Sequence, residues 1–310
     1  MTNNYNINQF QFFTFITGLQ NKEQELIKKL IKSFPYKDTH KINIIDKTEA
    51  LRRKFINKEK IFHSERVYIV KDNMDFDFDL WEEFIKSNQI YINIIKEKSF
   101  DVHIKSVHKI MTEYLDVDFA VILDSDTKFI NADYLPDVIK LLNTHNKNGD
   151  VAALGEIYQE APFSLPFKSY LPQDFYRLIL NEKRISYLQA LKGAIRFYFS
   201  RMKPNDNDRV HKFPRLFTSL IAIEKSIYNN NNMLSKYLWL EVIKEHKKKW
   251  LSHRIMGDAG ASLLYQISMA EKKIINIKYK KYISHTRSGS RPKSQKESNE
   301  RNWLKFDYNI

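Results

Sequence analysis

The sequence contains no cysteine, and it has only 7 glycines and 8 prolines among 310 residues. The absence of cysteine excludes disulfides and thiolate metal sites, so a bound metal would have to be held by carboxylates and imidazoles. The low glycine and proline content excludes collagen-like and low-complexity chains. With a hydrophobic fraction of 43%, the composition indicates a globular protein that can bury a sizeable core.

Long apolar stretches are missing as well. No run approaches the roughly 18 apolar residues that a membrane-spanning helix needs. The opening MTNNYNINQFQ lacks the basic and apolar regions of a secretory signal. We therefore expect a cytoplasmic protein. The formal net charge of +14 predicts attraction to polyanions, namely phosphorylated ligands, anionic membrane surfaces or nucleic acid.

Strand-like and helix-like segments alternate through the first 150 residues. Short apolar, β-branched runs predict strands, and apolar residues at helical spacing predict helices. The expected strands are 10–17, 41–46, 66–72, 91–95 and 119–126, and the expected helices are 22–33, 80–87 and 103–115. This alternation is typical of an α/β fold, with a mainly parallel central sheet flanked by helices. Farther along, residues 272–285 predict one or two strands that end at His285.

Acidic residues stand where several of these strands end. Asp46, Asp72, Asp124 and Asp126 all occupy such positions. In open parallel sheets, ligands bind at the carboxyl ends of the strands. The acidic strand ends are therefore the first indication of a functional site.

The strongest single motif is FAVILDSD, in which a buried strand leads to Asp124 and Asp126 with Ser125 between them. Two carboxylates side by side are costly to leave unpaired, and a divalent cation would neutralise them. Carboxylate oxygens suit Mg²⁺ or Mn²⁺. The alternative is an ordinary acidic turn after a strand, because Asp and Ser favour turns.

The stretch from RVYIVKDN to FAVILDSD, residues 66–126, resembles the nucleotide-binding half of family 2-type glycosyltransferases of the GT-A fold. The segments YLPDVIKLLNTHNKNGDVAALGEI, GDAGASLLYQISMAEKKIINI and YISHTRSGS resemble later elements of that family. The resemblance implies a nucleotide-sugar and metal-binding half over residues 1–160. It also implies an acceptor-binding half, more helical and with a basic tail, over residues 161–310.

The resemblance implies a role for each matching residue. Asp258 would be the catalytic base, and the metal, Mn²⁺ or Mg²⁺, would be held by Asp124, Asp126 and His285. The donor would be contacted by Thr17, Gly18, Asp46, Asp72, Lys105, Asp124 and Arg287. Asp46 and Asp72 compete for the nucleobase, and the spacing downstream of Asp72 favours that residue. The loop TGLQNK after the first strand departs from the proline–aromatic–asparagine loop of the family.

Several of these residues also have an ordinary structural interpretation. Asp258 precedes a helical run and could simply cap that helix. His285 could be a surface histidine, and Arg287 could belong either to a lid over the diphosphate or to a basic tail. Lys105 lies between His103 and His108, where a solvated helix face is the alternative to donor contact.

The sequence thus predicts an inverting, metal-dependent hexosyltransferase that uses a nucleotide-sugar donor, with UDP as the expected nucleotide. Its acceptor would be a glycan or a lipid-linked molecule of surface polysaccharide biosynthesis. The basic, aromatic segments 185–203 and 241–254 could lie on the inner face of an anionic membrane. No nucleic-acid-binding motif is found. The alternatives are a nucleotidyltransferase, or a non-catalytic basic protein that binds membranes or glycans on a degenerate transferase fold.

Overall fold

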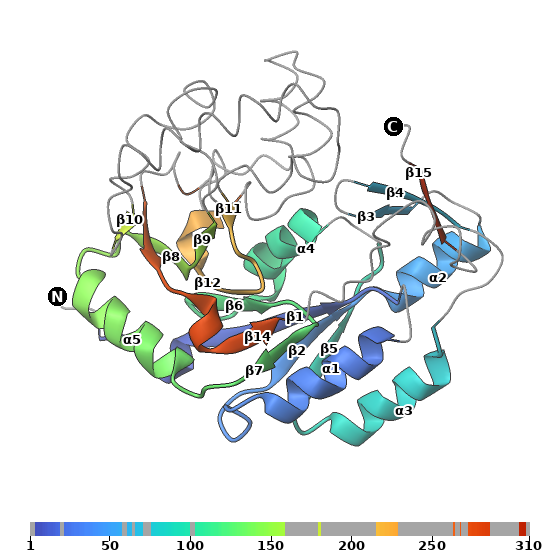
Figure 1. Cartoon of the computed structure of the whole chain (residues 1–310), viewed down its shortest axis with the longest axis horizontal. Helices are drawn as coiled ribbons and strands as arrows, with labels where there is room; N and C mark the ends of the chain where they lie inside the picture. The colour runs from blue at the N-terminus through green and yellow to red at the C-terminus, as the bar shows by residue number, and fades with distance from the viewer. Residues whose placement is uncertain are drawn as a thin grey trace, which may run out of the picture.

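A computed structural model gives the arrangement of the chain (Figure 1). It describes residues 4–18, 22–57, 61–63, 66–70, 76–99, 103–158, 179–180, 215–228, 263, 267, 272–285 and 304–307. Most of the described residues belong to the predicted nucleotide-binding half. The division at residue 160 therefore stays a prediction, as does the more helical character of the second half.

Eight of the described strands form one central sheet, in the order β10-β13-β8-β12-β6-β1-β2-β5. Their bounds are β1 Phe10–Ile16, β2 Ile42–Asp46, β5 Ile92–Lys96, β6 Phe119–Leu123, β8 Val151–Gly155, β10 Ile179–Leu180, β12 Leu220–Glu224 and β13 Lys273–Asn276. Every neighbouring pair is parallel except the two pairs that β12 makes, with β6 and with β8. The predicted mainly parallel sheet is confirmed.

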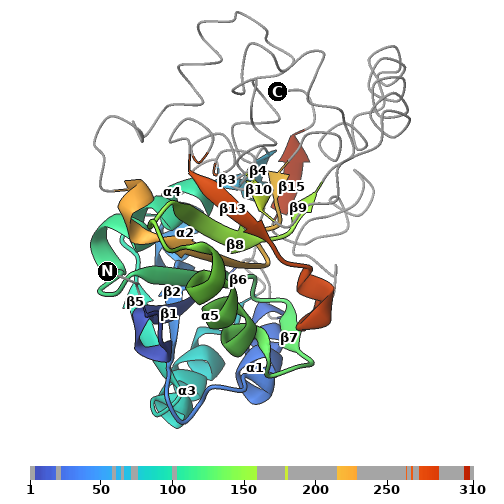
Figure 2. The same ribbon diagram turned by 90° about the vertical axis from the view of Figure 1, so that its left-hand side faces the viewer.

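Helices cover both faces of this sheet, as Figures 1 and 2 show. One face carries α1 (Lys22–Ser33), α3 (Phe78–Asn88) and α5 (Tyr134–His145), and the other carries α4 (His103–Lys109) with a π-helical turn, Ile110–Tyr114. A further helix, α2 (Thr48–Ile56), follows β2 directly. The predicted helices 22–33, 80–87 and 103–115 are confirmed. A mainly parallel sheet needs this cover because both of its faces are apolar.

The strand β1 shows why the central strands read as unbroken apolar runs. Phe12 and Ile16 belong to the core under α1, α3 and α5, whereas Phe13 and Phe15 belong to the core under α4. Successive side chains of a strand point to opposite faces. Because both faces are covered, both sets are buried, and the polar alternation of a half-exposed strand does not occur.

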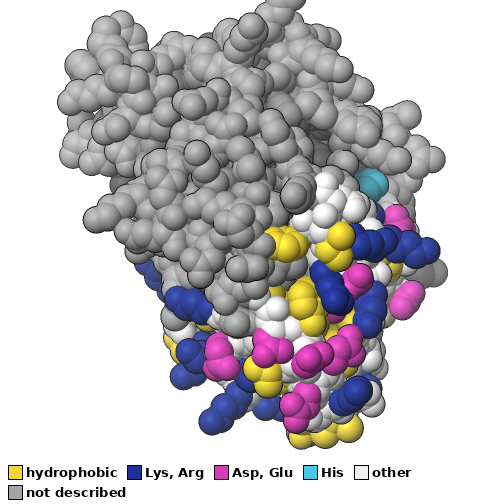
Figure 3. Space-filling model, turned by 90° about the vertical axis from the view of Figure 1, so that its right-hand side faces the viewer, with side chains coloured by type: hydrophobic (Ala, Val, Ile, Leu, Met, Phe, Trp, Pro, Cys, Tyr) yellow, Lys and Arg dark blue, Asp and Glu magenta, His cyan; other side chains and the backbone are white. Residues whose placement is uncertain are grey.

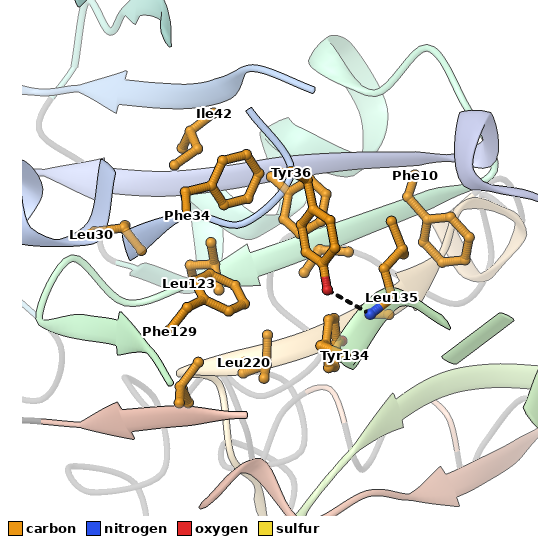
Figure 4. Packing of buried hydrophobic residues seen from close by; sticks show 14 of the residues in the cluster. Phe10, Leu30, Phe34, Tyr36, Ile42, Leu123, Phe129, Tyr134, Leu135 and Leu220 are labelled. Carbon is orange, nitrogen blue, oxygen red and sulfur yellow. Dashed lines mark hydrogen bonds between the residues drawn. The ribbon is translucent and has the colours of Figure 1, made fainter. Parts of the chain in front are cut away.

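The core beneath α1 and α5 contains an internal hydrogen-bonded tyrosine, Tyr36 (Figure 4). Its hydroxyl accepts the Leu135 N–H at 2.8 Å and donates to the Ala132 carbonyl at 2.7 Å. Burial raises the pKa of Tyr36 to about 12. The ring stacks on Phe12 with centroids 5.4 Å apart. Tyr36 thus satisfies the backbone at the start of α5 while it fills the core.

Three smaller sheets lie outside the central one. They pair β9 (Ile157–Tyr158) with β11 (Arg215–Leu216), β7 (Thr127–Phe129) with β14 (Ile283–His285), and β4 (Arg66–Val70) with β3 (Ile61–His63) and β15 (Leu304–Asp307). Of these strands, β7 directly follows the predicted metal motif of Asp124 and Asp126. The predicted strand that ends at His285 is confirmed as β14.

The position of β4 corrects one expectation. The sequence predicts residues 66–72 as a parallel strand of the central sheet, but β4 ends at Val70 and pairs antiparallel with β3 and β15. The central-sheet strand beside β1 is β2, which ends at Asp46. The run RVYIV does form a strand, but its local sequence does not specify the strands with which it pairs.

The surface of the described part is mixed in charge. On the face shown in Figure 3, Lys and Arg side chains lie among Asp and Glu side chains over the described part of the surface. The net charge of +14 is therefore not gathered into a patch of one sign on that part of this face. None of the described helices has the length and apolar character that crossing a lipid bilayer requires.

Candidate active site at the carboxyl edge of the sheet

The carboxyl ends of the parallel strands meet at one edge of the central sheet, which we call the carboxyl edge. Since β12 runs antiparallel, its amino end lies at the same edge. The residues that the chain places there are Thr17 and Gly18 after β1, Asp46 at the end of β2, Glu97 after β5, Asp124 to Asp126 after β6, Glu156 after β8 and Ser219 before β12. The edge is rich in carboxylates.

Asp124 is the first residue after β6, and its backbone and side chain are both tied down. Its N–H donates to the Ser219 carbonyl at 3.3 Å, and the Ser219 hydroxyl donates to Asp124 Oδ2. On the other side, the N–H and Oγ1 of Thr127 donate to the Asp124 carbonyl at 3.2 and 2.8 Å. These bonds close a tight turn over Ser125 and Asp126. We call residues Asp124 to Asp126 the D-x-D turn. The acidic turn that the sequence offers as the alternative to a metal site is therefore present.

The same turn leads into β7, and β7 determines where His285 lies. In the antiparallel pair of β7 and β14, His285 stands opposite Thr127, the residue that follows Asp126 (Figure 1). The pairing therefore brings the backbone of all three predicted metal ligands to one place, across 158 positions of sequence between Thr127 and His285 (285 − 127). The side chain of His285 lies outside what the structure describes. Among the described side chains, no group of three metal-ligating residues is found.

The strand β14 is anchored to α5 by polar contacts at its start. The Tyr282 hydroxyl donates to Asp137 Oδ2 at 2.8 Å, and Lys281 Nζ donates to the same oxygen. The bond from Lys281 holds the pKa of Asp137 below its usual value, and burial raises the pKa of Tyr282 to about 12. The Tyr282 carbonyl also accepts the Ile130 N–H at 2.9 Å. These contacts fix the approach of β14 to the D-x-D turn.

The loop after β1 is held by a residue that the sequence analysis does not single out, Glu23 in the first turn of α1. The Glu23 carboxylate is buried and accepts the N–H and the hydroxyl of Thr17 at 2.7 and 2.6 Å. It also accepts the Gly18 N–H at 3.1 Å. The backbone amides of Thr17 and Gly18, the two residues of this loop predicted to contact the donor, are thus bonded to an internal carboxylate. The signal that could have found it is an acidic residue in the first turn of the helix that follows the first strand.

Replacing Glu23 by alanine is expected to loosen this loop. The N–H groups of Thr17 and Gly18 would both lose the carboxylate as their acceptor, at a cost of about 1–3 kcal/mol for each buried donor. The amides of Thr17 and Gly18 should then exchange with solvent roughly tenfold faster or more, because each 1.4 kcal/mol is a factor of ten. Hydrogen exchange followed by NMR measures this.

The matched control for this experiment is Glu25→Ala. Glu25 lies in the same first turn, but its side chain is 63% exposed and, among the described residues, forms a 3.4 Å ion pair with Lys28. Exchange at Thr17 and Gly18 should stay at its wild-type rate in the control. Equal exchange rates in both variants would contradict a clamping role for Glu23.

Two features require a glycine at position 18, namely its backbone conformation and the close approach of Thr48. Its φ is +79°, and a Cβ at this position would lie 3.1 Å from Thr48 Cα. Thr48 begins α2, and its N–H and hydroxyl donate to Asp46 Oδ1 at 2.9 and 2.7 Å. The β1 loop therefore packs directly on the turn that follows β2.

Asp46 is itself enclosed by donors. It is 5% exposed, and its second oxygen accepts the indole N–H of the buried Trp81 at 2.9 Å. Three of the roughly four acceptor positions of the carboxylate are used internally. Asp46 thus ties α2 and α3 to the end of β2. A donor contact by Asp46 stays a prediction, and this geometry gives it a structural role in addition.

Glu156 is a second carboxyl group at the edge that the sequence analysis passes over. It is half-buried, and burial raises its pKa above the ordinary value of a glutamate. Its Oε2 accepts the Tyr279 N–H at 3.0 Å, and its carbonyl accepts the Phe217 N–H at 2.8 Å. The signal that could have found it is the same as for Asp124, an acidic residue at the end of a buried apolar strand.

Five predicted residues are not described in side-chain detail, and His285, whose backbone belongs to β14, is one of them. Asp72, Asp258 and Arg287 lie outside the described residues, as do the basic segments 185–203 and 241–254. Lys105 belongs to α4, but its side chain is outside the described set. The roles predicted for these five residues stay predictions.

Comparison with known proteins gives a result at the level of structure only. No protein-family model and no curated protein matches the sequence. Similar solved structures include residues 1–349 of TarS from S. aureus in complex with UDP-GlcNAc, at 12% identity and a TM-score of 0.41, covering 91% of this chain and 59% of that one. Another is the mannosyltransferase PcManGT from Pyrobaculum calidifontis in complex with GDP-Man and Mn²⁺, at 11% identity and a TM-score of 0.37, covering 87% and 54%.

A third is core-mannan synthase A from Aspergillus fumigatus in its Mn/GDP form, at 9% identity and a TM-score of 0.40, covering 89% of this chain and 74% of that one. The chain spans less than two thirds of the TarS and PcManGT chains. The structures found are GT-A glycosyltransferases, the class that the sequence resembles. The likeness concerns the fold, and nothing about activity follows from it.

Proposed function

We propose that this protein is an inverting glycosyltransferase that moves a hexosyl group from a nucleoside diphosphate sugar to a glycan or lipid-linked acceptor. The observation that carries the proposal is the pairing of β14 with β7. It sets His285 opposite Thr127, beside Asp126 and at the carboxyl edge of the sheet. Such an edge is where α/β proteins bind their ligands.

The donor set suits Mn²⁺ or Mg²⁺. Asp124 and Asp126 offer carboxylate oxygens, and the imidazole of His285, whose backbone stands opposite Thr127, would complete the set. Hard oxygen ligands favour these ions, and imidazole is compatible with Mn²⁺. A metal bound there would stabilise negative charge on the departing diphosphate. Asp124, Asp126 and His285 would hold it.

Other residues of the chain would act as the base and bind the nucleotide. The acceptor hydroxyl oxygen would form a bond to the anomeric carbon while the bond from that carbon to the diphosphate oxygen breaks. Asp258 would take the hydroxyl proton, which is worth about two to four orders of magnitude in rate. Attack opposite to the leaving group inverts the anomeric centre. The nucleotide would lie against the ends of β1 and β2, near Thr17, Gly18 and Asp46.

The test is calorimetric titration of the full chain with UDP and with GDP, each in the presence of Mn²⁺ and again with EDTA. Micromolar binding of one nucleotide that disappears with EDTA is the expected result, and it would identify the base. Release of that nucleotide from its sugar donor, measured on addition of candidate acceptors, then tests transfer. Failure of both nucleotides to bind under every condition would contradict the proposal and favour the non-catalytic alternative.

A further inference from the structure

Ser219 contacts the D-x-D turn from a distant part of the chain. It is 2% exposed and immediately precedes β12. Its hydroxyl donates to Asp124 Oδ2, and its carbonyl accepts the Asp124 N–H at 3.3 Å. The two residues are 95 positions apart in the sequence. A backbone bond and a side-chain bond thus join the same two residues.

The register of the sheet explains this doubly bonded pair. Leu220 stands opposite Leu123 in the antiparallel pairing of β12 with β6. Continuing that ladder by one residue sets Ser219 opposite Asp124. Among the described neighbours of β6, β12 is the antiparallel one, and β1 on the other side is parallel. The reversed direction of β12 brings its first residues, rather than its last, to the carboxyl edge.

The backbone carbonyl and the side-chain carboxylate of Asp124 are held by different partners. Thr127 holds the Asp124 carbonyl and therefore sets the backbone of the turn. Ser219 is bonded to the carboxylate itself, so it restricts the rotation of that group about its side-chain bonds. Metal-binding carboxylates are commonly oriented by such a hydrogen bond from a neighbouring residue.

We propose that Ser219 is a positioning residue, which orients the Asp124 carboxylate for a divalent cation and the diphosphate of the donor. This rests on the proposed function. Without the hydroxyl, the carboxylate would lose a bond that restricts its rotamer, and a metal would have to orient it more on binding. Loss of such an orienting partner typically weakens metal binding about 10–100-fold.

The experiment measures Mn²⁺ affinity in three variants of the full chain. Ser219→Ala removes the hydroxyl, Ser219→Thr keeps it, and Ser226→Ala is the matched control. The Ser226 hydroxyl also donates to a carboxylate, that of Glu224, but at the opposite end of β12. Mn²⁺ binding is followed by EPR of the free ion, and binding of UDP or GDP in saturating Mn²⁺ by calorimetry.

The expected result is a dissociation constant for Mn²⁺ that rises about 10–100-fold in Ser219→Ala. It should recover toward the wild-type value in Ser219→Thr and stay unchanged in Ser226→Ala. Thermal denaturation of the two alanine variants separates this effect from a general loss of stability. Wild-type Mn²⁺ affinity in a folded Ser219→Ala variant would overturn the inference alone. Absence of Mn²⁺ binding by the wild-type protein would overturn the proposed function and the inference with it.

Discussion

Replacement of Asp126 by alanine is expected to abolish Mn²⁺-dependent nucleotide binding and to slow sugar transfer by about 10²–10³-fold or more. A metal contributes several kcal/mol to charge stabilisation in such reactions, and each 1.36 kcal/mol is a factor of ten in rate. Asp126 lies in the turn between β6 and β7, one residue before the position paired with His285. Calorimetry with UDP or GDP and a nucleotide-release assay measure the two losses.

Asp116→Ala provides the matched control. Asp116 is exposed and lies just before β6, at the opposite end of the strand that leads to Asp126. This variant should bind nucleotide and transfer sugar as the wild type does. Both variants must unfold at similar urea concentrations for the comparison to hold. Retention of metal-dependent binding in folded Asp126→Ala would remove this residue from the metal site.

Replacement of Asp46 by alanine is expected to lower the free energy of unfolding by about 3–5 kcal/mol. The change would leave the Thr48 N–H, the Thr48 hydroxyl and the Trp81 indole N–H without their acceptor. Thr48 and Trp81 are 3% and 1% exposed, so water cannot readily replace the carboxylate. Each unsatisfied buried donor costs about 1–3 kcal/mol. The sum is a large part of the roughly 5–15 kcal/mol that stabilises a typical domain.

Urea denaturation compares this variant with Asp38→Ala. Asp38 is an exposed aspartate in the connection between α1 and β2. The control should change stability by no more than about 0.5 kcal/mol. An Asp46→Ala protein that is as stable as the control but no longer binds nucleotide would show that Asp46 serves the ligand and not the fold. Loss of stability with nucleotide binding retained would assign it to the fold alone.

The sequence predicted β1, β2, β5, β6, α1, α3 and α4 because their signals are local, whereas α2, β3 and β7 were not predicted. The apolar runs of β1 and β6 and the helical spacing of α1 identify buried strands and a helix without reference to any partner. The run RVYIV was also a correct strand prediction, yet its place was wrong. It pairs with residues 304–307, and no local pattern specifies a partner so far away.

For the candidate site, too, the sequence predicted the local features and missed those that depend on distant segments. The strand exit before Asp124 and Asp126 is visible in the sequence, because a buried apolar run that stops at two acidic residues is a local feature. The roles of Glu23 and Ser219 were not predicted. The role of Glu23 depends on how α1 packs against the end of β1. The role of Ser219 depends on the direction in which β12 runs.

The sequence by itself therefore determined which segments form strands and helices and where carboxylates leave the sheet. Periodicity and propensity act within a few residues along the chain. Only the tertiary structure decided which strands are neighbours, that β12 runs antiparallel between β6 and β8, and that His285 stands beside the D-x-D turn. The physical reason is that strand pairing and register are set by the packing of faces contributed by distant segments, which single segments do not encode.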